Sequence, residues 1–240
     1  MVTVIGHRGA AGLKPENTMS SFLRAVDEGC DMVELDVHLS GDGYIVIMHD
    51  ETVDRTTDGV GRISDLDLKE LRSLDAGDGE RIPTLSEVFE LLRNRCLLNI
   101  ELKGEGTAIP VSGMLEEEIN SGRWSGENIL ISSFSPVSLK EFMDARTDVK
   151  TAILIDGNPG GAEEFAKQIG SVAVNPNYMF LEPDFIDMCR KLGLMVNTWT
   201  VNDPDQMERM ISLGVDGIIT DRPDLLVKKI NRGKRSAHHE

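Results

Sequence analysis

The residues of this sequence with the clearest chemical potential lie in a stretch where acidic and apolar residues alternate, 31–38 (DMVELDVH). Successive side chains of a strand point to opposite faces, so Glu34 and Asp36 share one face while the apolar residues between them share the other. Two neighbouring carboxylates repel each other and resist burial unless a cation lies between them. The stretch therefore favours a metal site, and a solvated strand face is the alternative.

A second alternating stretch, residues 97–103 (LLNIELK), places Glu101 and Lys103 on one face of a predicted strand. Other residues with acid, base or cationic side chains also stand where predicted strands end. In a barrel of parallel strands, the active site lies at the C-terminal ends of the strands. The residues that occupy such positions are His7, Arg8, Glu34, Asp36, His49, Glu101, Lys103 and Trp199. A lone histidine would indicate little, but this coincidence favours an active site.

Strand-like and helix-like patterns alternate along the whole chain, which is typical of parallel strands joined by crossover helices. The strands are expected over residues 2–6, 31–38, 97–102, 129–132, 150–154, 171–174, 194–198 and 217–219. The helices are expected over residues 16–28, 84–94, 111–120, 136–145, 161–168, 183–191, 204–212 and 223–231. The pattern predicts an α/β fold, a single closed (β/α)8 TIM barrel. No glycine-rich nucleotide-binding motif supports an open doubly wound sheet.

Nothing resembling a linker divides the 240 residues, so we expect residues 1–232 to form one catalytic barrel domain. A further short strand over residues 44–48 precedes a small insertion after the second strand. Residues 51–82 form this insertion, which is rich in Asp, Gly and Thr and is expected to be an excursion over the barrel mouth. Residues 233–240 are expected to form a polar tail, and the two histidines in it to be solvated.

Composition limits the partners of the protein. A formal net charge of -16 argues against nucleic acid and anionic membranes as partners, because both attract basic surfaces. The N-terminus lacks the pattern of a secretory signal, and no apolar run approaches about 18 residues, so no stable membrane insertion and a cytoplasmic location are expected. The 3 cysteines are far apart and without CxxC spacing, which favours reduced thiols. The oligomeric state is not indicated.

Six short motifs occur in a fixed order along the chain. They are residues 7–9 (HRG), 15–18 (PENT), 34–37 (ELDV), 49–50 (HD), 99–103 (NIELK) and 214–221 (GVDGIITD). In this combination and spacing, the sequence resembles the glycerophosphodiester phosphodiesterase family over residues 4–223. The resemblance implies hydrolysis of a small-molecule glycerophosphodiester to sn-glycerol 3-phosphate and an alcohol, and thus a place in lipid and glycerol metabolism.

The resemblance also implies a metal ion bound by Glu34, Asp36 and Glu101. Ligands that are all oxygen atoms favour Mg²⁺ or Ca²⁺ over zinc. A phosphodiester gains negative charge when it is attacked, so a divalent cation is suited to the reaction.

The resemblance further implies that His7 and His49 form an acid–base pair and that Arg8 and Lys103 contact the phosphate. Histidine can accept or donate a proton near neutral pH, and a guanidinium can bind two phosphate oxygens at once. The sequence leaves open which histidine is the base. It also leaves open whether water or the glycerol 2-hydroxyl attacks phosphorus. We favour the hydroxyl, because an internal nucleophile is already positioned.

Several further residues have two interpretations. Trp199 is expected to contact substrate, and with Phe134 and Met179 to form an apolar wall for the glycerol carbons; core packing is the alternative for the latter two. Glu16 and Asn17 are expected to cap the first helix or to brace the first loop. His38 shares the parity of Asp36, but we expect a mouth or packing residue rather than a ligand.

Three other classes of protein compete with this interpretation. A metal-dependent lyase or isomerase barrel would not need two histidines together with two cations suited to phosphate. A two-metal hydrolase normally has His-x-His on its first strand, where this chain has His7-Arg8-Gly9. A non-catalytic binding protein would be expected to lack a histidine or a carboxylate. The leaving group, whether choline, ethanolamine, glycerol, inositol or a lysolipid, is not indicated.

Overall fold

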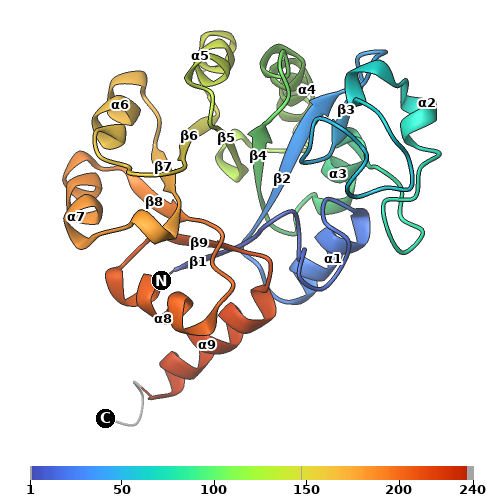
Figure 1. Cartoon of the computed structure of the whole chain (residues 1–240). Coiled ribbons are helices and arrows are strands. Elements are labelled where there is room, and N and C mark those ends of the chain that lie inside the picture. The colour runs from blue at the N-terminus through green and yellow to red at the C-terminus, as the bar shows by residue number, and fades with distance from the viewer. Residues whose placement is uncertain (1, 147, 237–240) are drawn as a thin grey trace.

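The computed structural model describes residues 2–146 and 148–236, which form a closed barrel of parallel strands surrounded by helices (Figure 1). The barrel strands are β1 (Thr3–Gly6), β2 (Met32–Leu39), β4 (Leu97–Leu102), β5 (Ile129–Ser133), β6 (Lys150–Ile155), β7 (Ala173–Pro176), β8 (Met195–Thr198) and β9 (Gly217–Thr220). Strand β1 pairs in parallel with both β9 and β2, and these two pairings close the ring. The predicted (β/α)8 barrel is confirmed.

Each barrel strand is followed by a helix on the outside of the ring. The helices are α1 (Met19–Asp27), α3 (Leu85–Leu92), α4 (Ala108–Asn120), α5 (Pro136–Ala145), α6 (Ala162–Ile169), α7 (Pro183–Leu192), α8 (Pro204–Leu213) and α9 (Pro223–Ser236). Helix α8 shows why they begin and end where they do. The Asp203 side chain accepts hydrogen bonds from the amides of Asp205 and Gln206, Pro204 begins the helix, and Gly214 ends it at a φ of 80°.

Most predicted boundaries agree with the structure to within a few residues, and two differences have a clear cause. Helix α1 begins at Met19 rather than at residue 16, because the Thr18 side chain caps it by accepting from the amide of Ser21. Helix α9 continues to Ser236, so the predicted tail does not begin at residue 233. A glycine inside a helix costs only about 1 kcal/mol relative to alanine. This cost is too small for Gly233 to end the helix. Residues 237–240, with the two tail histidines, lie outside the described residues.

The alternating strands separate an apolar outer layer from a partly polar barrel interior. Val33, Leu35 and Val37 of β2 are fully buried in the main core, between the strands and the helices. Inside the barrel, Leu130 of β5, together with residues of β6 and β7, forms a separate apolar cluster. Glu34 has the opposite parity to Leu35 and faces the interior. The apolar cluster fills part of the interior, and the carboxylates occupy the C-terminal end of the strands.

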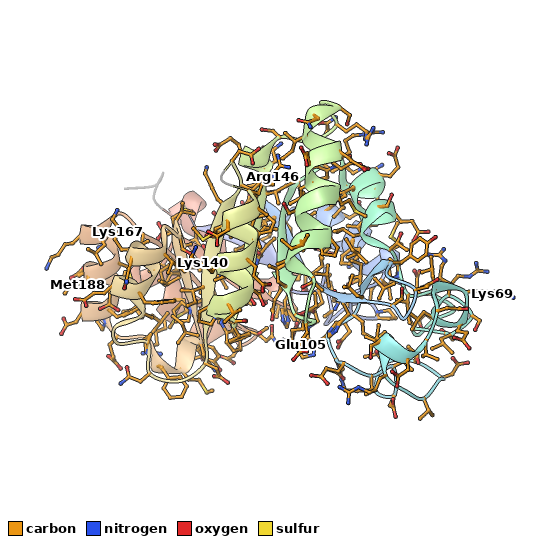
Figure 2. The ribbon with its side chains drawn as sticks, turned by 90° about the horizontal axis from the view of Figure 1, so that it is seen from above. Lys69, Glu105, Lys140, Arg146, Lys167 and Met188 are labelled. Atoms are coloured by element: carbon orange, nitrogen blue, oxygen red, sulfur yellow. The ribbon has the colours of Figure 1, made fainter. Side chains whose placement is uncertain are left out.

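The insertion after β2 begins with β3 (Ile45–Ile47), which pairs antiparallel with β2. It continues with the short helices η1 (Ile63–Asp65) and α2 (Leu68–Leu71) and has an apolar cluster of its own. Figure 2 shows Lys69 of α2 at the edge of the molecule, and Glu105, in the loop after β4, near the end where the strands finish. Within the described residues, no helix is long and apolar enough to cross a membrane.

Candidate active site

Three carboxylates meet at the C-terminal ends of β2 and β4. The strands pair so that Asp36 lies opposite Glu101, and this register brings Glu34 of β2 to the same place. One oxygen from each of the three carboxylates can be chosen so that all lie within 4.8 Å of one another, and all three residues are buried. The structure therefore brings together the three residues for which the sequence predicted a shared metal ion.

The environment of this cluster resists the presence of three negative charges. Burial and the neighbouring carboxylates of Asp36 and Glu101 raise the pKa of Glu34 well above its usual value. Burial and the charge of Asp36 likewise raise the pKa of Glu101 to about 7. A cation among the three carboxylates would remove the repulsion that adds to the effect of burial in both shifts.

The donor set fits a hard divalent cation. All three charged ligands are carboxylates, which suit Mg²⁺ or Ca²⁺ better than softer metals. Asn99 lies two residues before Glu101 on β4, and its buried Oδ1 atom has no hydrogen-bond partner among the described residues. A buried amide oxygen without a partner is costly, so this atom is suited to face a cation, a water molecule or a substrate hydroxyl. The residues present therefore agree with the group that the sequence implied.

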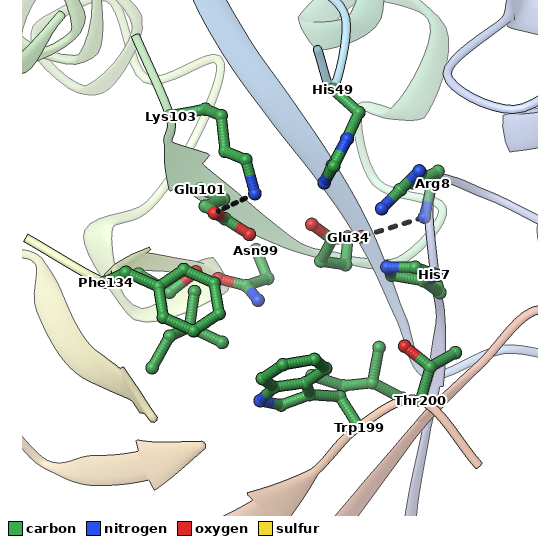
Figure 3. A pocket seen from close by; sticks show the side chains of 13 residues that line it. His7, Arg8, Glu34, His49, Asn99, Glu101, Lys103, Phe134, Trp199 and Thr200 are labelled. Atoms are coloured by element: carbon green, nitrogen blue, oxygen red, sulfur yellow. Dashed lines mark hydrogen bonds and ion pairs between the residues drawn. The ribbon is translucent and has the colours of Figure 1, made fainter. Parts of the chain in front are cut away.

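Arg8 is fixed at the edge of the cluster by its backbone and its side chain. Its amide donates to Oε2 of Glu34 at 2.8 Å, as Figure 3 shows, and Nη1 donates to Oε1 of Glu16 at 2.7 Å. Its Nε atom lies 3.5 Å from Oδ2 of Asp36. The Arg8 backbone has a φ of 50°, a left-handed conformation that most residues avoid. Backbone strain of this kind is found where a side chain must be aimed at a functional site.

Glu16 and Asn17 do not cap α1, because Thr18 does so, and they instead brace the first loop and the site. The Asn17 side chain donates to Oδ2 of Asp36 at 2.8 Å. The Asn17 amide donates to the carbonyl oxygen of Arg8 at 3.0 Å. Of the two predicted roles, bracing is therefore the one that the structure shows.

His7 and His49 both line the pocket, and each is hydrogen-bonded to an aspartate. Nδ1 of His7 lies 2.6 Å from Oδ1 of Asp221, and Nδ1 of His49 lies 2.6 Å from Oδ1 of Asp50. A carboxylate at Nδ1 holds the neutral ring in the tautomer with the proton on that nitrogen. The Nε2 atom of each ring is then left to exchange a proton with a ligand. Figure 3 shows both rings pointing toward Glu34.

The aspartates are held in their charged forms by further partners. Hydrogen bonds from Arg55 hold the pKa of Asp50 well below its usual range. Burial raises the pKa of Asp221, but the hydrogen bonds of its side chain with His7 and Asn202 lower it by more. The pKa of Asp221 therefore lies below its usual value. Burial lowers the pKa of His49, more than the nearby charge of Asp36 raises it. His49 is therefore mainly neutral at neutral pH.

Lys103, Phe134 and Trp199 complete the pocket. Lys103 Nζ donates to Oε1 of Glu101 at 3.0 Å and lies 5.3 Å from the centroid of the Phe134 ring. Phe134 meets Trp199 edge to face, with 5.4 Å between ring centroids. Figure 3 shows Trp199 on the opposite side of the pocket from His49, and Phe134 on the same side as Lys103. The pocket thus has both charged and apolar side chains.

One pocket collects the predicted site residues. It is lined by His7, Arg8, Glu34, His49, Asn99, Glu101, Lys103, Phe134 and Trp199, among others. Asp36 lies beneath it, in contact with Arg8 and Asn17. Met179, a candidate for the apolar wall, is exposed and does not line this pocket. His38 is buried, with Nε2 3.2 Å from the carbonyl oxygen of His49, which agrees with a packing role.

Sequence reasoning missed the partners of the two histidines. Asp50 and Asp221 were each within a quoted motif, and their positions next to a strand end were the available signal. Asn202 and Arg55 had no such signal, since they come from loops whose path the sequence pattern does not determine. Asn99 shares the parity of Glu101, so its place in the pocket could have been inferred from alternation alone.

Comparison with known proteins gives consistent matches over nearly the whole chain. The family model described as "Glycerophosphoryl diester phosphodiesterase family" matches residues 7–225. A glycerophosphodiester phosphodiesterase of Caldanaerobacter subterraneus subsp. tengcongensis is 40% identical over 239 residues, which are 96% of this chain and 98% of that protein. A glycerophosphodiester phosphodiesterase of Bacillus subtilis is 30% identical over 256 residues, with 97% of this chain and 87% of that protein covered.

Solved structures agree with these sequence matches. A phosphodiesterase of Oleispira antarctica, in complex with the product sn-glycerol-3-phosphate, has a TM-score of 0.89 and 31% identity, with 95% of this chain and 96% of that chain covered. A glycerophosphodiester phosphodiesterase of Thermotoga maritima has a TM-score of 0.80 and 32% identity, with 95% and 98% covered. The fold and these matches define a phosphoric diester hydrolase built on a (β/α)8 barrel. This chain belongs to the glycerophosphoryl diester phosphodiesterase family, as its motifs predicted.

Proposed function

We propose that this protein uses a divalent cation to hydrolyse glycerophosphodiesters to sn-glycerol 3-phosphate and an alcohol. The observation that supports this most strongly is one pocket that holds acidic, basic and cationic groups together. Glu34 and Glu101 line it beside both histidines, Arg8 and Lys103, together with an apolar wall. The product complex of the similar Oleispira antarctica enzyme supports the assignment of the product.

Glu34, Asp36 and Glu101 are the residues that would hold the cation, and Mg²⁺ and Ca²⁺ are the ions that suit them. Such an ion would supply positive charge to the phosphate oxygens and would make a nearby hydroxyl more acidic. Arg8 and Lys103 add fixed positive charge at the same pocket. Positive charge from these sources stabilises the dianionic character that develops as phosphorus is attacked.

His49 is proposed as the first general base, because burial lowers its pKa and keeps the ring neutral at neutral pH. His7 then serves as the general acid that protonates the departing alcohol. Each ring is held by an aspartate at Nδ1, so Nε2 is the atom proposed to exchange the proton in both cases. The two roles are reversed in a second step if the reaction passes through a cyclic intermediate.

The glycerol 2-hydroxyl is the proposed nucleophile. An internal hydroxyl held beside phosphorus avoids the entropy that a free water molecule would lose, an advantage of up to several kcal/mol. His49 takes the hydroxyl proton, a cyclic glycerol 1,2-phosphate forms, and the alcohol leaves with a proton from His7. Water then opens the ring to give glycerol 3-phosphate. Trp199 and Phe134 provide the apolar wall for the glycerol carbons.

The function is tested by incubating the purified protein with a panel of diesters and identifying the products by phosphorus NMR. Glycerophosphocholine, glycerophosphoethanolamine, glycerophosphoinositol and bis-glycerophosphate differ only in the leaving alcohol. We expect sn-glycerol 3-phosphate from at least one of them. No turnover of any glycerophosphodiester under metal-replete conditions would contradict the proposed function.

The nucleophile is tested with an analogue in which hydrogen replaces the 2-hydroxyl and the leaving group is unchanged. The internal mechanism predicts that turnover collapses while the analogue still competes with the parent diester for binding. Near-equal turnover of the two compounds would instead show that water attacks phosphorus directly.

A further inference from the structure

Arg55 lies in the insertion after β3 and joins the two sides of the candidate active site. Its guanidinium lies between two carboxylates, Asp50 and Glu16, each of which holds a side chain that lines the pocket. Asp50 holds His49 through its Nδ1 atom, and Glu16 holds Arg8 through its Nη1 atom. A continuous ionic network therefore runs from a histidine on one loop to an arginine on another.

All the contacts of this network are short and well directed. Nε of Arg55 donates to Oδ2 of Asp50 at 2.6 Å, and Nη2 donates to Oδ1 at 3.2 Å. On the other side, Nη1 donates to Oε2 of Glu16 at 2.9 Å and Nη2 to Oε1 at 2.7 Å. Arg55 thus binds both carboxylates in a forked manner, which fixes their direction as well as their distance.

We propose that Arg55 is a positioning residue that fixes His49 and Arg8 relative to each other. This inference rests on the proposed function, in which His49 moves a proton and Arg8 binds phosphate. Without the Arg55 guanidinium between them, the side chains of Asp50 and Glu16 would have no shared partner and would be free to change direction. The ring of His49 and the guanidinium of Arg8 would then each lose the group that directs it.

The insertion holds Arg55 in place. Val53, two residues earlier, is fully buried in the separate apolar cluster of the insertion. The Val53 carbonyl oxygen accepts from the amide of Thr57 at 3.1 Å and from its hydroxyl at 2.7 Å, which closes a turn around Arg55. The cluster therefore anchors a turn whose exposed arginine reaches back to the pocket. This gives the segment around Arg55 a role in catalysis, although Arg55 is not among the residues that line the pocket.

The aspartate that holds the other histidine has a different partner, which makes the role of Arg55 specific. Asp221, the partner of His7, is bound by the neutral side chain of Asn202, whose Nδ2 donates to it at 2.5 Å. Asp50 instead has the charged guanidinium of Arg55 as its partner. Arg55 therefore both orients Asp50 and offsets part of the negative charge that would favour the protonated form of His49.

A purely structural ion pair predicts a different outcome from a positioning role. The Arg55 side chain is 48% exposed, and exposed ion pairs contribute little to stability. Arg62 in the same insertion provides a matched control, since it is 62% exposed and its Nη2 donates to Oε2 of Glu51 at 2.8 Å. Loss of either arginine is expected to change the melting temperature little. Only loss of Arg55 is expected to impair turnover.

The first experiment compares Arg55→Gln, Arg55→Lys and Arg62→Gln with the wild type on a glycerophosphodiester. Misdirected catalytic groups can cost about 100-fold in rate, so we expect kcat/KM of Arg55→Gln to fall by about 10- to 100-fold. The decrease should appear mainly in kcat. Arg55→Lys should be intermediate, because it keeps the charge and loses the fork. Arg62→Gln should be unchanged, and an Arg55→Gln enzyme with wild-type kinetics would overturn the inference.

The pH profile supplies a readout that a merely structural role would not move. The charged groups around His49 are Asp50 on its own loop, Asp36 of β2, Arg8 after β1 and Lys103 after β4. Arg55→Gln removes the cation on Asp50 and leaves the other groups in place. The carboxylate then favours protonated His49 more strongly, and the acidic limb of kcat/KM should move upward by about half a pH unit or more. An unmoved or lowered limb would contradict the inference.

A mutant cycle tests the bridge without relying on any one variant. Asp50→Asn and Glu16→Gln should be non-additive in kcat/KM when Arg55 is present, because they act through one guanidinium. In the Arg55→Gln background the same two changes should become additive. If the effects of the two changes were additive in both backgrounds, the proposed link through Arg55 would be wrong. The same would follow if the two changes were equally non-additive in both backgrounds. If His49→Ala were fully active, the assignment of His49 as the base would fail and this inference with it, whereas the proposed function itself fails only if the wild type turns over no glycerophosphodiester.

Discussion

His7 and His49 come from different strands and are held in the same way, each through Nδ1 by an aspartate at 2.6 Å. The two aspartates, Asp221 and Asp50, follow β9 and β3. In both pairs the engaged nitrogen leaves Nε2 to face the pocket. The site is therefore built around two rings whose Nε2 atoms are both free for proton transfer, so that a neutral ring can accept a proton there and a protonated ring can donate one.

Removing either ring tests this arrangement. His7→Ala and His49→Ala should each lower kcat by about two to four orders of magnitude, the usual contribution of a positioned acid or base. Circular dichroism should show an intact barrel in both variants. A His49→Ala enzyme with near-wild-type turnover of a diester that has a poor leaving group would show that the pair is wrongly assigned.

The pH dependence of activity follows from the burial of His49. Burial disfavours the charged ring, so the pKa of His49 lies below its ordinary value of 6.5. A base must be neutral to act, and it is neutral above its pKa. The acidic limb of the kcat/KM profile should therefore lie below pH 6.5 and be absent in His49→Ala. A limb well above pH 7 would contradict the role of His49 as the base.

The sequence was sufficient to predict the barrel and candidate catalytic groups that the structure brings together at one end of it. Alternation placed Glu34, Asp36 and Glu101 on inward faces, and the rule that barrel sites lie at strand ends brought them together. These features depend on local periodicity, which is written directly in the order of the residues. The parallel register of β2 with β4 then aligns Asp36 with Glu101.

The supporting groups could not be predicted in the same way. Arg55 approaches Glu16 from 39 positions away, and Asn202 approaches Asp221 from 19 positions away. Neither contact has a periodic signal, because both depend on the paths of loops. Thr18 rather than Glu16 caps α1. The sequence could not distinguish them, because both are polar residues near the start of the helix and only the backbone conformation decides which one is the cap.

Metal binding should stabilise the folded protein, because it relieves repulsion among three buried carboxylates. At a cation concentration of 100 times Kd, the free energy of unfolding should rise by about 2.7 kcal/mol. This corresponds to a melting temperature roughly 5 to 10 °C higher for a domain of this size. Glu101→Gln should lose most of this increase. Glu105→Gln is the matched control, since Glu105 is exposed in the loop that follows the strand of Glu101.

Differential scanning calorimetry with and without metal ions measures this change in melting temperature. A melting temperature that is the same with Mg²⁺, with Ca²⁺ and with excess chelator would contradict a metal site at Glu34, Asp36 and Glu101. An equal response of Glu101→Gln and the wild type would place the ion elsewhere.

Arg8→Lys should impair the enzyme although it preserves the charge. The planar guanidinium donates to Glu16 through Nη1 and still has other N–H groups for the pocket, a combination that the single ammonium of lysine cannot reproduce. Loss of a hydrogen bond to a charged group corresponds to roughly a 10- to 100-fold decrease in kcat/KM. Arg24→Lys, in a partly exposed pair with Glu28 on α1, is the control. Unchanged kinetics in Arg8→Lys would show that Arg8 has only a structural role.

We propose that a divalent cation and this pocket together cleave glycerophosphodiesters. The most direct test is the rate of sn-glycerol 3-phosphate release from glycerophosphocholine by one protein sample, before chelation, after exhaustive chelation, and after Mg²⁺ or Ca²⁺ is restored. We expect the rate to fall by about 100-fold or more on chelation, since metal ions supply several kcal/mol to such reactions, and to recover with the ion. Full release of sn-glycerol 3-phosphate by the chelated protein would contradict the claim.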